Sequence, residues 1–111
     1  MILAIINDPF SVETLLNNLS EADFDLEDVS VVMGDLKRRT AYGQNAGPLN
    51  GIGPEGVGEA LIGLGISEDG AKQCQDAVAQ GNILVVMKVV QEYSPAAEKI
   101  FQDHSAQLIK G

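Results

Sequence analysis

The sequence predicts an α+β protein, a ferredoxin-like α/β sandwich with an extra short helix and a glycine-rich joint between its two halves. Short apolar runs alternate with amphipathic stretches, as strand, helix and strand over residues 1–42 and as helix, strand and helix over residues 66–111. Residues 43–65, between these halves, are rich in glycine and end in the short helix. Two such halves pack as one sheet with its helices on one face, and 111 residues are enough for a single domain of this kind.

In the first half, an apolar strand leads through a turn into an amphipathic helix and a second strand. Residues 1–6 are apolar and stop at Asn7-Asp8-Pro9, a typical turn. Ser11 offers its hydroxyl to the free N–H groups of a helix start, which predicts a helix over about residues 12–22. Residues 29–33 follow an acidic stretch and are mostly valine, so we expect the second strand there. The apolar face of the helix has spacings of three and four: Val12, Leu15, Leu16 and Leu19.

The joint leads into two helices. Pro54 suits the first position of a helix because it has no N–H to leave unpaired, and we expect a short helix from there to about residue 64. Gly65 is its C-terminal stop. Ser67 then caps a second helix, which ends at Gly81 and has Ala71, Cys74, Ala77 and Val78 on its inner face.

A strand and a helix follow, with a further short strand at the end. The run Ile83–Met87 is too continuously apolar for a half-exposed strand, which predicts a central strand covered in part on both sides. Ser94 followed by Pro95 predicts the start of the last helix. Its inner side consists of Ala97, Ile100, Phe101 and His104. Residues 107–110 are expected to form an edge strand.

Composition excludes several classes of function. The net charge of -9 repels phosphate backbones and anionic lipid, so we expect no nucleic-acid partner and no membrane partner. The one basic run, Lys37-Arg38-Arg39, is interpreted as solvated. Cys74 is the only cysteine, so no intrachain disulfide forms, which fits a reducing cytoplasm. Residues 1–6 are too short an apolar run for a signal peptide or a membrane span.

Two segments resemble the bacterial general stress protein 17M-like domains, also described as YflT-like or heat-induced stress protein domains. They are ADFDLEDVSVVMGD and, more strongly, EALIGLGISEDGAKQCQDAVAQGNILVVMKV. The matching features are Gly63-Leu64-Gly65-Ile66, the acidic helix start Ser67-Glu68-Asp69, Ala71, Gly81 and the strand Ile83–Met87. Departures are a shorter glycine-rich insert, Ser67 where relatives commonly carry proline, and no tyrosines in the following helix. The resemblance implies a stress-associated cytoplasmic domain and no particular reaction.

A literal G-x-G-x-x-G occurs at Gly51, Gly53 and Gly56, a pattern that can hold a dinucleotide. That function requires a preceding strand and a helix that points at the phosphate. Pro48 argues against the strand, and no basic residue lies between residues 43 and 71 to support an anion. A flexible joint is favoured over a weaker anion or small-ligand contact, and both over a dinucleotide site.

Metal and nucleophile patterns are weak. The acidic stretch at residues 21–28 does not fit a calcium-binding loop, which needs glycine at its sixth position and glutamate at its twelfth. With Asp23 as the first position, the sixth is Asp28 and the twelfth is Gly34. One histidine, His104, cannot form a histidine-based metal site. Cys74 with His104 is a formal nucleophile–base pair, but a thiol on an alanine-rich inner face is expected to be inert. We therefore assign no catalytic residue, no cofactor and no metal ligand.

Three functions remain as hypotheses. The first is a non-enzymatic stress module that acts through self-association, as a homodimer, or through partner binding. The second is a sensor of a small ligand or anion, held between the joint and the strand ends near Gly34 and Lys88. The third and weakest is a cysteine-dependent enzyme. The candidate ligand or interface residues are Gly51, Gly53, Gly56, Gly63, Gly65 and Lys88.

Overall fold

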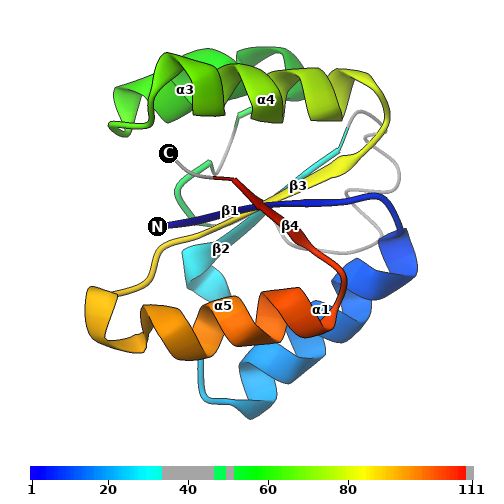
Figure 1. Ribbon diagram of the computed structural model, residues 1–111, viewed down its shortest axis with the longest axis vertical. Coiled ribbons are helices and arrows are strands. Elements are labelled where there is room, and N and C mark those ends of the chain that lie inside the picture. Colours follow the sequence, from blue (N-terminus) through cyan, green and yellow to red (C-terminus); the bar gives the residue numbers. More distant parts are fainter. Residues whose placement is uncertain (34–46, 50–51, 110–111) are drawn as a thin grey trace.

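The computed structural model describes residues 1–33, 47–49 and 52–109, which form an α+β fold with one sheet (Figure 1). Its elements are the strands β1 (Ile2–Ile6), β2 (Val29–Val32), β3 (Ile83–Met87) and β4 (Gln107–Ile109), and the helices α1 (Pro9–Glu21), α3 (Val57–Gly63), α4 (Glu68–Ala79) and α5 (Ser94–Asp103). Single 3₁₀ turns occur at Leu26–Asp28, Pro54–Gly56 and Gln91–Tyr93. The short helix that was expected after Pro54 is therefore a 3₁₀ turn followed by α3.

The four strands form an antiparallel sheet in the order β2-β3-β1-β4. β1 pairs with β3 from Ile2 opposite Met87 to Ile6 opposite Ile83, and with β4 from Leu3 opposite Ile109. β2 pairs with β3 from Val29 opposite Met87. All five residues of β3 are buried, which confirms the prediction of a central strand at these residues.

Helices cover both faces of the sheet, and the expectation of helices on one face is wrong (Figure 1). α1 and α5 lie against one face, while α3 and α4 lie against the other. The reason is in the central strands, whose successive side chains point to opposite faces and are apolar on both. In β3, Val85 packs in the core beneath α1 and α5, whereas Leu84 packs in the core beneath α3 and α4.

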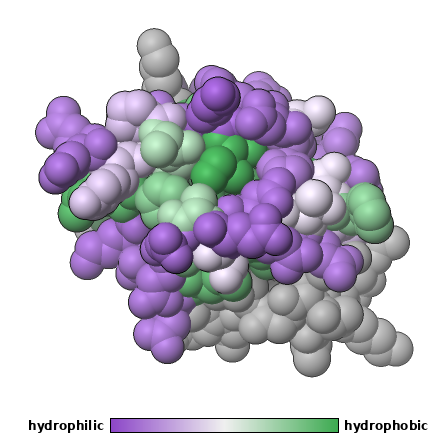
Figure 2. Space-filling model, turned by 90° about the horizontal axis from the view of Figure 1, so that it is seen from below, coloured by the Kyte–Doolittle hydropathy of each residue, from purple (hydrophilic) through white to green (hydrophobic). Residues whose placement is uncertain are grey.

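The layer formed by α1 and α5 buries the larger of the two apolar clusters. From α1 it takes the four residues that the spacing predicted, Val12, Leu15, Leu16 and Leu19. From α5 it takes Ala97 and the fully buried ring of Phe101. Outside this core the layer presents mostly hydrophilic residues to solvent, with a few apolar ones between them (Figure 2).

The layer formed by α3 and α4 buries the second cluster. α4 contributes Ala71, Cys74 and Val78, while Ala77 of the predicted inner face is only half-buried. α3 packs against α4, and the side chain of Gln75 accepts a hydrogen bond from the N–H of Gly58 at 2.9 Å. The polar tie fixes the two helices against each other above the sheet.

Two of the three predicted helix caps require correction. Asp8, and not Ser11, caps α1: its carboxylate accepts the N–H of Phe10 at 3.0 Å, and Pro9 is the first helical residue. Ser67 caps α4 as expected, because its hydroxyl accepts the N–H of Gly70 at 3.1 Å. Ser94 is the first residue of α5 and makes no capping bond, because the preceding 3₁₀ turn runs directly into that helix.

All four described α-helices end in the same turn, in which the residue after the C-cap has a left-handed backbone. After α3 and α4 that residue is Gly65 or Gly81, with φ of 94° and 95°. After α1 and α5 it is Asp23 or Ser105, with φ of 68° and 59°. The next N–H in each case donates to a carbonyl five positions earlier: Phe24 to Leu19, Ile66 to Leu61, Asn82 to Ala77 and Ala106 to Phe101.

Residues 47–49 of the joint are fixed against β2. Gly47 has φ of 75°, and a Cβ atom there would lie 2.7 Å from the carbonyl carbon of Val29. The N–H of Leu49 donates to Oγ of Ser30 at 2.8 Å, and the Leu49 side chain is fully buried beneath α3 and α4. These three residues are therefore packed against the sheet, whereas the expectation of a flexible joint at Gly51, Gly53 and Gly56 stays a prediction. Residues 43–46 and 50–51 of the joint, with Gly51 among them, lie outside the described residues, and so does the basic run at residues 37–39.

Candidate functional site

The antiparallel pairing brings three residues together at one end of the sheet. Ile2 and Val29 both lie opposite Met87, so the residues next to them, Met1, Asp28 and Lys88, share this end. The N–H of Lys88 donates to the carbonyl of Asp28 at 2.9 Å, which fixes the two backbones side by side. The Lys88 side chain is exposed, as expected for a lysine at the exit of a buried strand.

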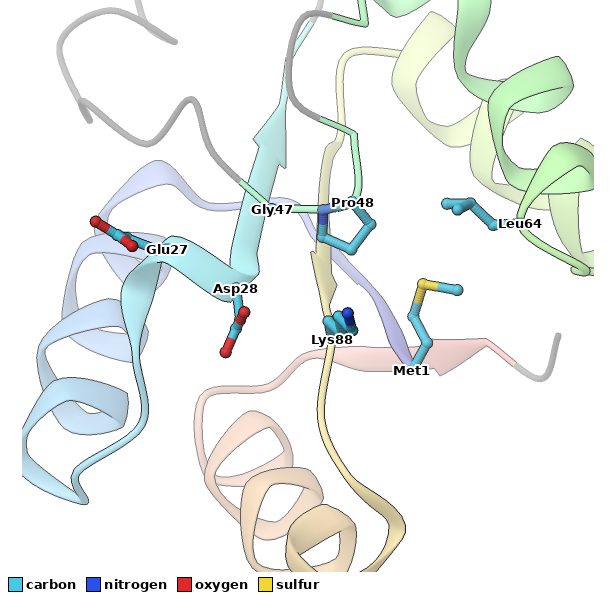
Figure 3. A pocket seen from close by; sticks show the side chains of 7 residues that line it. All are labelled: Met1, Glu27, Asp28, Gly47, Pro48, Leu64 and Lys88. Carbon is cyan, nitrogen blue, oxygen red and sulfur yellow. The ribbon is translucent and has the colours of Figure 1, made fainter.

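A cavity of about 450 Å³ opens at this end. It is lined by Met1, Glu27, Asp28, Gly47, Pro48, Leu64 and Lys88. The side chains of Met1 and Leu64 lie on one side of it and Pro48 faces them, while Lys88 lies between Asp28 and Met1 (Figure 3). The Glu27 carboxylate points away from the centre. The cavity is thus an apolar hollow with one cation and one anion at its base.

A second cavity of about 320 Å³ adjoins the first, because Asp28 and Lys88 line both. Its other lining residues are Asp23, Phe24, Asp25, Met87, Val89, Val90 and Tyr93. It joins the acidic loop after α1 to the segment after β3. We call the residues that line the two cavities the strand-end surface.

The predicted site residues separate in the structure. Lys88 belongs to the strand-end surface, whereas Gly34 lies outside the described residues. Met33, the last described residue after β2, lies at the other end of the sheet from Lys88, because β2 and β3 are antiparallel. The ligand site expected near Gly34 and Lys88 therefore stays a prediction. Gly53, Gly63 and Gly65 have open space where a side chain would begin, and Gly65 ends α3 beside Leu64.

The glycine pattern lacks the setting of a dinucleotide site. The described residues that precede Gly51, 47–49, lie in a turn and not in a strand. Gly53 precedes the 3₁₀ turn before α3 and Gly56 ends that turn, and α3 itself has only seven residues. A Cβ atom at Gly56 would lie 3.5 Å from the side chain of Ile52. Neither the strand nor the long helix that phosphate binding of this kind requires is found here.

Cys74 and His104 lie on opposite sides of the sheet. Cys74 is fully buried beneath α4, and burial raises the pKa of its thiol from 9.0 to about 11. His104 follows α5 in the other layer, where Nε2 accepts a hydrogen bond from the side-chain amide of Asn18 at 2.7 Å. The sheet separates the two groups, so they cannot act as nucleophile and base on one substrate.

Within residues 1–33, 47–49 and 52–109, no group of three or more His, Cys, Asp or Glu side chains is placed to hold a metal ion. No helix in the same ranges is long and apolar enough to cross a membrane. Comparison of the chain with family models, curated proteins and solved structures gives no match. The chemistry of the described side chains is therefore the basis for a function.

Sequence reasoning identified Lys88 but missed the residues around it. Met1, Asp28, Pro48 and Leu64 come from four segments far apart in the chain, and none carries a pattern of its own. One signal was present: Leu64 directly precedes Gly65, the expected stop of the short helix, and it is 43 % exposed as the C-cap of α3. A leucine beside a C-terminal glycine can point out of the helix face, which makes it a candidate for contact with another molecule.

Proposed function

We propose that this protein is a non-enzymatic, stress-associated module that acts by association, as a homodimer joined along the outer edge of β4. The observation that carries the proposal is the character of that edge. β4 ends the described sheet and pairs with β1, so its other side offers backbone donors and acceptors to a further strand. Its residues, Gln107, Leu108 and Ile109, bear no charge.

A neutral edge matters in a chain with a net charge of -9. Two copies that meet elsewhere on an acidic surface repel each other, whereas antiparallel pairing of β4 with its symmetry mate places no like charges opposite one another. Of the two strands that end the described sheet, β2 already has residues 47–49 packed against it. These features favour β4 as the seam of the dimer, the line along which the two copies pair.

The strand order supports a ferredoxin-like core. α1 joins β1 to β2 and α5 joins β3 to β4, both on the same face, with β3 and β1 in the centre. In this interpretation α3 and α4 are an insertion between β2 and β3 that covers the second face. The stress association itself rests on the resemblance at Gly63-Leu64-Gly65-Ile66, and the single cysteine favours a cytoplasmic setting.

Analytical ultracentrifugation over micromolar concentrations tests the dimer. Gln107→Lys places like charges across the proposed seam and should weaken dimerisation about tenfold, since it opposes both pairing and close approach. Gln80→Lys, at the exposed C-cap of α4, is the matched control because it changes the net charge equally. A protein that stays monomeric throughout, or a control that weakens the dimer as much, would refute the proposed seam.

The cavity of about 450 Å³ supports a second candidate, a small-ligand sensor. Its apolar hollow with Lys88 and Asp28 at the base suits a small amphipathic molecule that carries a charged group. A thermal-shift screen with amino acids and nucleotides tests it, with Lys88→Met as the variant that should abolish any gain. If no compound raises the melting temperature of the wild type, the sensor hypothesis fails.

A further inference from the structure

The strand-end surface concentrates exposed apolar side chains. Six large apolar residues in the described ranges are exposed, and four of them, Met1, Leu64, Val90 and Tyr93, line its two cavities. Val90 is 61 % exposed and Tyr93 is 55 % exposed. Single apolar residues on a surface are ordinary, but a group of them around hollows marks a place where another molecule binds.

The charges around these side chains have one predominant sign. Four acidic side chains line the two cavities, namely Asp23, Asp25, Glu27 and Asp28, and Lys88 is the one basic side chain in the lining. The whole chain, at -9, adds a field of the same sign. A molecule that binds here needs apolar groups for the hollows and positive charge for their rim.

We propose that the strand-end surface docks a basic amphipathic segment of a partner protein. An apolar side chain of that segment enters the larger cavity between Leu64 and Pro48, and a second one covers Val90. A neighbouring Lys or Arg reaches Asp28, and a guanidinium can also lie over the ring of Tyr93. Lys88 repels the positive charges of the segment and so determines which register of the segment fits the surface.

A second copy of this chain does not satisfy the same surface. Two strand-end surfaces face to face would bring their acids together, which is unfavourable for like charges. The surface is centred on the ends of β2 and β3, and β1 separates it from β4. Docking of a basic segment therefore goes beyond the proposed dimer and is compatible with it.

Selection from a library of displayed random peptides against the immobilised full chain tests the proposal. Enriched peptides should combine Lys or Arg with Leu, Ile or aromatic residues. The best peptide is then labelled, and its affinity is measured by fluorescence anisotropy for the wild type and for variants. Since the variants change exposed residues, their melting temperatures should match that of the wild type.

Two changes at the strand-end surface should act in opposite directions. Val90→Ser should weaken the peptide about tenfold through loss of an apolar contact, whereas Lys88→Glu should strengthen it about threefold through removal of the opposing charge. Phe10→Ser is the matched control, because Phe10 is 72 % exposed and lies in the first turn of α1 at the other end of the sheet. Higher salt should weaken binding.

Four results would overturn the proposal. They are a failure to enrich any peptide, enrichment of acidic or uncharged peptides, an equal loss of affinity in Phe10→Ser, and a dimer that dissociates in Val90→Ser. The last of these would assign the surface to a second copy. Because the dimer test uses β4 variants, failure of one proposal can be distinguished from failure of the other.

Discussion

Substitution of Gly47 by alanine should destabilise the protein more than the same change at Gly63 or Gly65. An alanine there must adopt φ near 75°, which costs roughly 1–2 kcal/mol for an L-residue. Its Cβ would also lie 2.7 Å from the carbonyl carbon of Val29 and 2.8 Å from Oγ of Ser30. Backbone atoms of a paired strand cannot move aside as a flexible side chain can.

The two contributions can be separated with other glycines. Overpacking of this kind costs about 1–3 kcal/mol, so Gly47→Ala should lower the free energy of unfolding by about 2–5 kcal/mol in total. Gly65 has φ of 94° but open space around it, so Gly65→Ala should show the backbone cost alone, about 1–2 kcal/mol. Gly63 ends α3 with open space and no positive φ, so Gly63→Ala should be neutral or stabilise by up to about 1 kcal/mol.

Urea unfolding followed by circular dichroism measures all three variants against the wild type. The urea concentration at the midpoint of unfolding should be highest for Gly63→Ala, lower for Gly65→Ala and lowest for Gly47→Ala. The dependence of the unfolding free energy on urea concentration should be the same in all three variants. The reasoning is refuted if Gly47→Ala costs no more than Gly65→Ala. That result would mean that residues 47–49 are not packed against β2 in solution.

Three further predictions concern single side chains. Because burial raises the pKa of Cys74 to about 11, the unfolded chain loses the thiol proton first, so stability should fall between pH 9 and pH 11 by about 2 kcal/mol relative to Cys74→Ala. A thiol reagent should label Cys74 only after unfolding, and rapid labelling of the native protein would contradict its burial. Ser30→Ala should lower the free energy of unfolding by about 1–3 kcal/mol, because the buried N–H of Leu49 loses its acceptor. The control Ser20→Ala, on the exposed side of α1, should be neutral. Equal losses for the two variants in urea unfolding would argue against the hydrogen bond. Ser105→Gly should stabilise by up to about 1 kcal/mol by relieving a left-handed serine after α5, and a lower melting temperature would contradict this.

The elements could be predicted from the sequence wherever apolar periodicity was strong. The buried faces of α1 and α5 followed from the spacing of apolar residues, and the central position of β3 followed from its uninterrupted apolar run. Helix ends were less predictable. Glycine in the sequence predicted the left-handed turns at Gly65 and Gly81. Asp23 and Ser105 adopt the same left-handed backbone conformation, but nothing in the sequence indicates it. Their conformation is imposed by the hydrogen bonds and packing around the helix end.

The sequence predicted the arrangement of the helical layers only in part. The apolar run Ile83–Met87 indicated a strand covered on both sides, and that observation conflicts with helices on one face. Consistent use of it would have placed α3 and α4 on the second face. The strand-end surface was harder to predict, because the direction of the strands decides which of their ends meet. Lys88 lies beside Asp28, and not beside Met33, only because β2 and β3 are antiparallel.

The pairing of β1 has a consequence for how the chain folds. β1 lies at residues 2–6, but both of its neighbours in the sheet come from residues 83–109. Such high contact order slows folding, because a long loop must close before any hydrogen bond of β1 forms. During synthesis, β1 therefore stays without its hydrogen-bonded neighbours until Ile83 and the residues after it have been made. We expect the nascent chain to depend on chaperones over this interval, although the finished fold is small.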